Sequence, residues 1–253
     1  MVMDKFIERG RFTLVYPVVL ICGLVLHSLT NDSTLQHQKD SHYLLSPNNI
    51  INLVFAYKGN LIWTILFASL AAYHIRLRIS SSDLLPRDAR TTRPVKWHRL
   101  GKEYMVKLIV KNLLLCVVFF VIDRVFVWTG GSCSSSATKS AEQCRKEGGK
   151  WENGFDISGH FCFLTNVSLI LWLELSSIQK QFASNERTPS KVWCVLLCLN
   201  VFVLTIWAFI LSVTAIYYHT TLEKILGLLM GYICPIVMYW LIPSHTALRH
   251  LLY

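Results

Sequence analysis

Charged side chains are scarce in this sequence. Asp, Glu, Lys and Arg account for 16% of its 253 residues, whereas 53% of the residues are hydrophobic and the mean hydropathy is +0.42. A soluble domain carries about a quarter charged residues, and here the charges only punctuate long apolar runs. The composition therefore indicates a membrane protein, and the length suits one compact bundle without an appended soluble domain.

Metal-binding and nucleic-acid-reading motifs are also absent. No CxxC or Cys/His metal spacing occurs, so we predict neither a metal ion nor another cofactor. The net charge is +10, but the densest basic stretch, 76–107, joins two apolar runs and has no zinc-finger or recognition-helix pattern. Anionic lipid headgroups account for such a stretch better than nucleic acid does, so we predict no nucleic-acid partner.

The apolar residues form six runs. Because a helix needs about 20 mainly apolar residues to span a bilayer, we predict an all-α polytopic membrane protein with six transmembrane helices in a single domain. The first run exceeds a usual signal-peptide core and lacks a small-residue cleavage site, which indicates a retained span. The predicted spans are 12–29, 53–73, 108–127, 160–178, 192–217 and 225–242.

The distribution of Lys and Arg predicts the orientation. With the N-terminus in the cytosol, the segments on that side hold 16 of the 25 basic residues, against 5 in the two loops on the other side. Positive charge favours the cytosolic side of a membrane. We therefore predict that both termini are cytosolic, that 74–107 is a basic cytosolic loop and that 128–159 is a loop on the opposite side.

Two of the eight cysteines lie outside the apolar runs. Cys133 and Cys144 belong to the 128–159 loop and stand between two Gly-Gly pairs. Disulfides persist on the non-cytosolic side, so we predict a Cys133–Cys144 disulfide, which would contribute about 3 kcal/mol against unfolding. Two free thiols are the alternative. Asn31 begins a glycosylation sequon on the same predicted side.

The first candidate for chemistry is His160, which ends the run Gly-Phe-Asp-Ile-Ser-Gly-His just before an apolar segment. Asp156 and Ser158 are good N-cap residues. A helix N-terminus presents unpaired N–H groups to an anion, and Gly159 lets a phosphate approach the backbone closely. His160 could then donate a proton to a leaving oxygen. The alternative is an interfacial histidine beside an ordinary helix cap.

The second candidate is His219, which lies between two apolar runs on the same predicted side. At helical spacing Glu223 falls one turn away and could orient the His219 imidazole, as a carboxylate does for a nucleophile or a base. A competing interpretation is structural, because Thr220-x-x-Glu223 also matches a capping box.

Basic residues in the spans supply the remaining site candidates. An ionisable group at the bilayer centre costs about 2.5–3.5 kcal/mol on insertion scales. Lys58, Arg124 and Lys224 fall near the non-cytosolic ends of their spans, where we predict that they bind substrate phosphate groups together with Ser158 and Gly159. Snorkelling could explain each cation separately, and it is the role that we predict for Lys111.

The sequence resembles a known family, the fat storage-inducing transmembrane (FIT) family of six-span endoplasmic reticulum proteins. Resemblance runs from about residue 47 to residue 240, and the fungal branch is the most similar. The most specific stretches are GFDISGH and HTxxEKxxGxxxG. The matching segments are 52–58, 128–131, 144–149, 154–160 and 219–224, with Gly227 and Gly231.

The resemblance implies a role in lipid droplet formation and in endoplasmic reticulum membrane structure. It also implies an acyl-coenzyme A diphosphatase with a lumenal site, which splits fatty acyl-CoA into acyl 4′-phosphopantetheine and adenosine 3′,5′-bisphosphate. The expected partners are fatty acyl-CoA and membrane lipids, including diacylglycerol and triacylglycerol. The sequence names no protein partner.

The family in turn resembles lipid phosphate phosphatases. Ser158-Gly159-His160 matches their second motif, and His219 with Glu223 keeps the spacing of the third, with Glu in place of Asp. The resemblance implies a metal-independent mechanism in which His219 attacks phosphorus and His160 supplies the proton. Their first motif is missing on this side, because Arg93-Pro94 lies in the basic loop, and so is the arginine ahead of His219.

Two other classes of function stay open. One is a non-catalytic protein that binds and partitions neutral lipids, with its polar face serving as a headgroup site. The other is a transporter that uses the charged residues of the spans as an ion path. Against a transporter, no pair of Gly/Pro-interrupted half-helices occupies symmetric positions.

Overall fold

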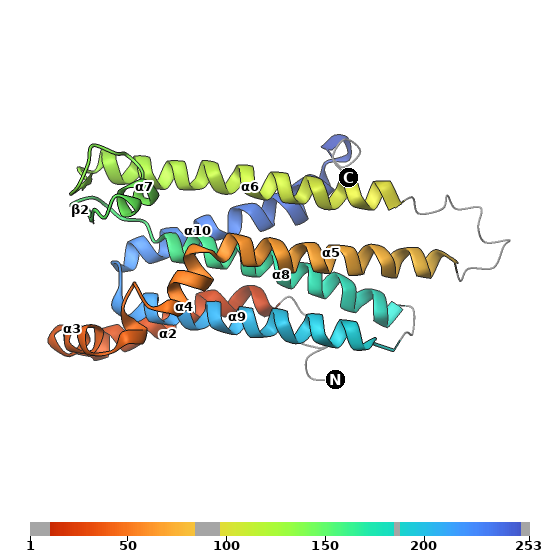
Figure 1. The fold of residues 1–253 in the computed structure, drawn as a ribbon, viewed down its shortest axis with the longest axis horizontal. Helices are drawn as coiled ribbons and strands as arrows, with labels where there is room; N and C mark the ends of the chain where they lie inside the picture. The colour runs from red at the N-terminus through yellow and green to blue at the C-terminus, as the bar shows by residue number, and fades with distance from the viewer. Residues whose placement is uncertain (1–10, 84–96, 185–187, 249–253) are drawn as a thin grey trace.

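The fold is a bundle of long helices, here in a computed structural model that describes residues 11–83, 97–184 and 188–248 (Figure 1). The long helices are α2 (Val15–Leu29), α5 (Gly59–Asp83), α6 (Trp97–Trp128), α8 (Gly159–Ser184), α9 (Lys191–Tyr217) and α10 (Thr221–Ile236). The short helices are η1 (Arg11–Leu14), α3 (Asp32–Ser41), η2 (Tyr43–Leu45), α4 (Ile50–Asn52), η3 (Leu53–Tyr57), α7 (Ala141–Lys146), η5 (Val237–Leu241) and α11 (Ile242–Ser244). Two strands, β1 (Ser132–Cys133) and β2 (Trp151–Glu152), pair antiparallel.

Within the described ranges, six helical stretches are long and apolar enough to cross a membrane. This confirms the predicted all-α architecture with six transmembrane helices. The helices extend further than the apolar runs, however. Residues 74–83 continue α5 and residues 97–107 begin α6, so much of the predicted 74–107 loop is helical. The remainder, 84–96, which includes Arg93-Pro94, lies outside the described residues.

Helix α8 is the centre of the bundle. In its most apolar window 83% of the residues are buried, against 22–39% in the other five stretches. A helix that is buried on all sides needs close neighbours, and α10 is one of them. A Cβ atom added to Gly227 would lie 2.5 Å from the Ser158 carbonyl oxygen, and one added to Gly231 would lie 2.9 Å from the Cys162 oxygen. The glycine pair therefore brings α10 against the first turns of α8.

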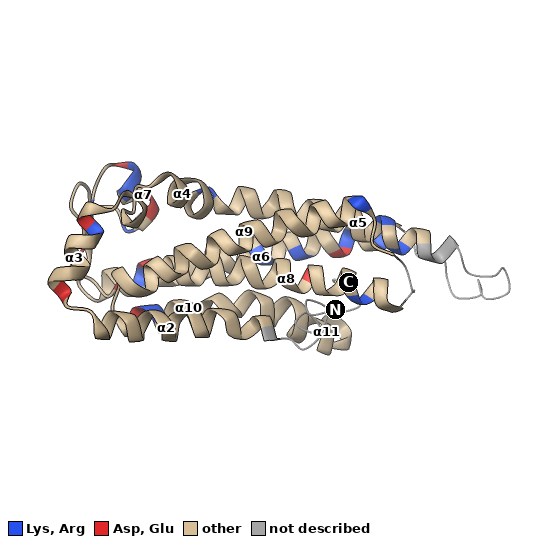
Figure 2. Ribbon diagram, turned by 90° about the horizontal axis from the view of Figure 1, so that it is seen from below, with Lys and Arg blue, Asp and Glu red and all other residues tan. Residues whose placement is uncertain are grey.

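The functional candidates gather at one end of the bundle. In Figure 1 the segments α3, α4, α7 and the β-ribbon lie together at the left, beside the N-terminus of α8 and the turn between α9 and α10. Figure 2 shows basic residues around α3 and α7 at this end and along α5 toward the other end. His160 and His219, which are far apart in the sequence, therefore share one end of the molecule.

A second polar cluster lies deeper in the bundle, around Glu174 of α8. The Glu174 carboxylate is 1% exposed and accepts from Lys107 Nζ at 2.8 Å and from the Tyr239 hydroxyl at 2.5 Å. The Tyr104 hydroxyl donates to its other oxygen at 3.0 Å. Because an unpaired buried charge costs several kcal/mol, these contacts join α6, α8 and η5 into one unit.

The predicted snorkelling of Lys111 is wrong. Its side chain is fully buried, and Nζ donates to the Asn60 side-chain oxygen and lies 4.0 Å from the centre of the Trp63 ring. An amide oxygen and an aromatic face together solvate the ammonium inside the bundle. Lys111 therefore does not need to reach the membrane surface.

Candidate functional site

His160 occupies the first turn of α8 and is held there by Asn52. The His160 Nε2 atom lies 2.9 Å from the Asn52 side-chain oxygen. The Asn52 amide nitrogen donates to the Pro47 carbonyl at 2.7 Å, which turns the amide oxygen toward the imidazole. Nε2 of His160 must therefore carry the hydrogen in this contact. This leaves Nδ1 as the nitrogen that can exchange a proton with a substrate.

His219 lies in the turn between α9 and α10 with a left-handed backbone. Its φ angle is +58°, a conformation that costs a non-glycine residue about 1–2 kcal/mol. Such strain persists where the surrounding contacts determine it, and it gathers at functional sites. The side chain is 17% exposed, and Nδ1 lies 3.5 Å from the Asp156 carboxylate and 3.8 Å from the Glu223 carboxylate.

Glu223 joins the two histidine segments. One of its oxygens accepts from the backbone N–H of Asp156 at 2.8 Å, and the other accepts from the backbone N–H of Thr220 at 2.7 Å. The Glu223 carbonyl also accepts from the Ser158 N–H at 3.1 Å. The capping box is thus formed, and both carboxylate oxygens are engaged with backbone. Glu223 acts on His219 mainly by fixing the backbone around it.

Asp156 is the carboxylate nearest to His219, and the sequence suggested for it only the role of a helix cap. Burial raises the pKa of the Asp156 carboxyl, and the charge of His219 opposes that rise. The carboxylate nearest to the His219 Nδ1 therefore comes from the loop before α8 rather than from α10. The contact depends on the hydrogen bonds by which Glu223 holds the two histidine segments together, here called the Glu223 clamp. No local sequence pattern reveals these hydrogen bonds.

The three predicted phosphate-binding cations have different surroundings. Lys58 follows η3 and is exposed at the end of the bundle that carries His160. Arg124 is exposed on α6, where its guanidinium carbon lies 4.7 Å from the centre of the Phe120 ring. Lys224 is 1% exposed, and its Nζ donates to the Ala215 carbonyl at 2.7 Å. The Lys224 ammonium therefore satisfies the end of α9, and we do not retain it as a phosphate ligand.

Ser158 and Gly159 begin α8. Ser158 is fully buried, and its hydroxyl accepts from the Phe161 N–H at 3.5 Å, as expected of an N-cap. A Cβ atom at Gly159 would meet only the Phe119 ring, at 3.4 Å, which is an ordinary contact distance. Packing therefore does not require glycine at position 159, although the site chemistry could.

The loop between α6 and α8 is fastened beside this site. Cys133 and Cys144 are joined by a disulfide, with their Cα atoms 5.7 Å apart. The Ala141 N–H at the start of α7 lies 3.5 Å from an Asp123 carboxylate oxygen on α6. The disulfide and this contact together hold α7 at the end of the bundle.

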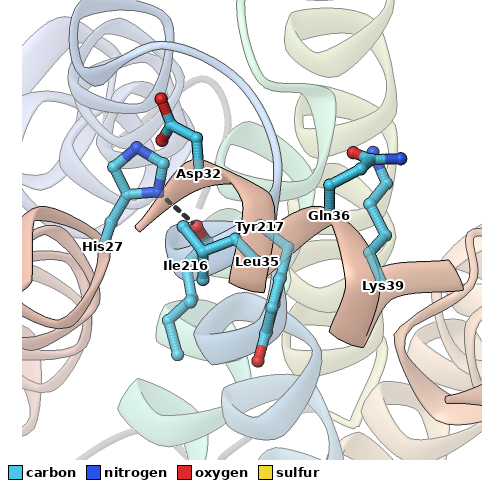
Figure 3. Close-up of a pocket in the computed structure, with 7 residues that line it drawn as sticks. All are labelled: His27, Asp32, Leu35, Gln36, Lys39, Ile216 and Tyr217. Atoms are coloured by element: carbon cyan, nitrogen blue, oxygen red, sulfur yellow. Dashed lines mark hydrogen bonds between the residues drawn. The ribbon is translucent and has the colours of Figure 1, made fainter. Parts of the chain in front are cut away.

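A small pocket opens at the same end but belongs to other elements. It lies among α2, α3 and the end of α9, where His27 Nδ1 contacts the Ile216 carbonyl at 2.8 Å (Figure 3). Its lining residues are His27, Asp32, Leu35, Gln36, Lys39, Ile216 and Tyr217. None of the predicted site residues lines it. In the described part of the chain, no group of three or more His, Cys, Asp or Glu residues could hold a metal ion.

These features define a polytopic helical membrane protein with two histidines held together at one end of the bundle. The chain belongs to the fat storage-inducing transmembrane protein family, whose model matches residues 40–198 and 178–239. No solved structure matches the chain.

Curated relatives cover most of the chain. Acyl-coenzyme A diphosphatase YFT2 of Saccharomyces cerevisiae is 43% identical over 95% of this chain and 95% of its own length. Acyl-coenzyme A diphosphatase FITM2 of Danio rerio is 29% identical over 90% of this chain and 85% of its own length. The human protein of the same name is 27% identical over 85% of this chain and 77% of its own length.

Proposed function

We propose that this protein is a fatty acyl-coenzyme A diphosphatase of the endoplasmic reticulum membrane, acting at a lumenal site built around His160 and His219. The observation that carries the proposal is the clamp by which Glu223 holds the two histidine segments together. The names of the relatives support the same activity. Its products would be acyl 4′-phosphopantetheine and adenosine 3′,5′-bisphosphate, and the activity would serve lipid droplet formation and membrane homeostasis.

The proposed mechanism begins with His219. Its Nδ1 faces Asp156 at 3.5 Å, so the hydrogen lies on Nδ1 and Nε2 keeps the lone pair that attacks. Nε2 forms a bond to one phosphorus of the pyrophosphate while the bond from that phosphorus to the bridging oxygen breaks. His160 enters this step as imidazolium, protonated on both ring nitrogens and stabilised by the negative charge of the bound pyrophosphate. The leaving phosphate oxygen takes the proton from its Nδ1.

Hydrolysis of the phosphohistidine completes the cycle. His160, now neutral, accepts a proton from water, and the water oxygen displaces Nε2 of His219 from phosphorus. The contact of His160 with Asn52 stays intact in both steps, because only Nδ1 exchanges its proton. Asn52 therefore acts as a positioning residue that keeps the imidazole at a fixed angle.

The negative charge of the pyrophosphate would be bound at the start of α8. Free backbone N–H groups and the helix dipole favour an anion there. Lys58 is exposed at the same end and adds a positive charge. The acyl chain would stay among the lipids, so that only the head group enters the polar site.

Gly159→Ala tests this phosphate cradle. We expect the thermal midpoint to stay unchanged, since the added methyl group meets only the Phe119 ring at 3.4 Å. The methyl group would separate the phosphate from the backbone N–H, and loss of one charge-assisted hydrogen bond corresponds to about a tenfold rise in KM. Gly101→Ala on α6 is the matched control, because no atom of the described residues lies within 4 Å of its added carbon. An unchanged KM in Gly159→Ala would remove the helix N-terminus from the proposed site.

The lumenal orientation has its own test. A glycosylation acceptor inserted between Cys133 and Cys144 should be modified in endoplasmic reticulum membranes, whereas one inserted between Asp83 and Trp97 should not. The reverse pattern would place both histidines in the cytosol and contradict the proposal.

A further inference from the structure

Beside each histidine lies a tyrosine whose ring is in contact with a basic side chain. The Arg145 guanidinium carbon lies 3.6 Å from the centre of the Tyr57 ring, and the centre of that ring lies 6.1 Å from the centre of the His160 imidazole. Lys39 Nζ lies 4.4 Å from the centre of the Tyr218 ring, and Tyr218 directly precedes His219. These residues come from α3, η3, α7 and the turn after α9, so the fold alone brings them together.

Of these two basic side chains, Arg145 is the one whose N–H donors are available to a ligand. It is exposed, and among the described residues its guanidinium makes no hydrogen bond or ion pair. Glu142, one turn earlier on α7, interacts with it electrostatically but pairs directly with Lys146 at 2.6 Å. Glu147 accepts from the Gln143 amide at 2.9 Å. Lys39, by contrast, is half-buried, and the carboxylate of Asp40 follows it directly.

The position of Arg145 is set by its neighbour Cys144. The Cys133–Cys144 disulfide anchors α7, and the Arg145 guanidinium lies over the Tyr57 ring, where it interacts electrostatically with His160. A guanidinium stacked on a ring keeps its N–H edges available, and these edges match the geometry of a phosphate. The arrangement is therefore a preformed phosphate contact adjacent to the two histidines.

We propose that Arg145, stacked on Tyr57, binds the 3′-phosphate of the substrate's adenosine end. The inference rests on the proposed function, because it uses the way an acyl-CoA would be placed. With the acyl chain in the bilayer and the pyrophosphate between the histidines, the adenosine end points into water. The 3′-phosphate is a monoester with two ionisable oxygens, and α7 lies at the end of the bundle that carries the N-terminus of α8 and the turn between α9 and α10 (Figure 1).

The test compares acyl-CoA with acyl-3′-dephospho-CoA in Arg145→Gln, Lys146→Gln and the unaltered protein. For Arg145→Gln we expect KM for acyl-CoA to rise about tenfold, with kcat unchanged, because one bidentate charged contact at an exposed site is lost. KM for the dephospho substrate should be the same in all three proteins. Lys146 is the matched control, since it is exposed on the same helix and its ion pair among the described residues is with Glu142.

Two outcomes would overturn the inference. A KM that rises equally for both substrates would assign Arg145 to the pyrophosphate or to the fold, and an unchanged KM would exclude it from the site. If the unaltered protein cleaves neither substrate, the proposed function fails but the inference is still testable. Adenosine 3′,5′-bisphosphate should then bind the unaltered protein about tenfold more tightly than adenosine 5′-monophosphate does. Arg145→Gln should abolish that difference, and equal binding of both nucleotides would refute the subsite.

Discussion

Replacement of His219 by alanine will lower kcat for acyl-CoA hydrolysis at least about 1,000-fold, because the proposed nucleophile that forms the bond to phosphorus is removed. His160→Ala removes a general acid instead, and such groups contribute about 100- to 10,000-fold. The two variants should differ in kind as well as in rate. Intact-protein mass spectrometry should detect a covalent adduct in His160→Ala, where hydrolysis of the intermediate is slow, and none in His219→Ala.

His37→Ala is the control for both variants, since His37 is exposed on α3 at the same end of the bundle. Its activity and its thermal midpoint should match those of the unaltered protein. Normal turnover in either His160→Ala or His219→Ala would refute the mechanism. Full support of lipid droplets by both inactive variants would favour a neutral-lipid-binding role over catalysis.

Asp156→Asn should lower kcat about 100- to 1,000-fold while leaving the thermal midpoint unchanged. In serine proteases the corresponding Asp-to-Asn change costs about 10,000-fold, because the histidine takes the wrong tautomer. We expect a smaller loss here, since Glu223 stays within 3.8 Å of His219 Nδ1. The fold should tolerate the change because Glu223 binds the backbone N–H of Asp156 and not its side chain.

The pH profile gives an independent measure of the same residue. The Asp156 carboxylate must be ionised to orient His219, and burial raises its pKa, so activity should fall on the acid side at a higher pH than an ordinary aspartate would give. Asp156→Asn should shift this acid limb, because one of the two groups that must be deprotonated is removed while the need for an unprotonated His219 nucleophile stays. If the limb persists unchanged in Asp156→Asn, another group orients His219.

Glu223→Ala tests whether the Glu223 clamp contributes to the stability of the fold as well as to catalysis. It should lower both kcat and the thermal midpoint, because the N–H groups of Asp156 and Thr220 lose their acceptors. Asp156→Asn should affect kcat alone. A Glu223→Ala variant with an unchanged midpoint would show that the clamp contributes little to stability.

The sequence was sufficient for the class of fold and for the placement of the two histidines at one end of the bundle. Apolar runs of bilayer length are a strong signal, because backbone polar groups must be satisfied within the membrane. His160 and His219 were identified through short local motifs that are present in this sequence. Their shared location at one end of the bundle followed from the alternation of spans.

The partners of the histidines could not be found in the same way. Asn52 on α4 contacts His160 directly, and Arg145 on α7 lies over the Tyr57 ring beside it, but both are distant from His160 in the sequence. Asp156 was visible, but its pairing with His219 depends on how the loop before α8 folds onto α10. Lys224 failed for a related reason. The sequence places it near the non-cytosolic end of the last span but does not say that its ammonium faces the α9 backbone.

The close contact of α10 with α8 at Gly227 and Gly231 affects how the site responds to changes in bilayer thickness. Both histidines are attached to helices that touch backbone to backbone, and the Ser158–Glu223 hydrogen bond joins the same two helices at their ends. When a bilayer thins or thickens, helices accommodate the mismatch largely by tilting. We expect α8 and α10 to tilt together, so that the spacing of the two histidines depends little on membrane thickness.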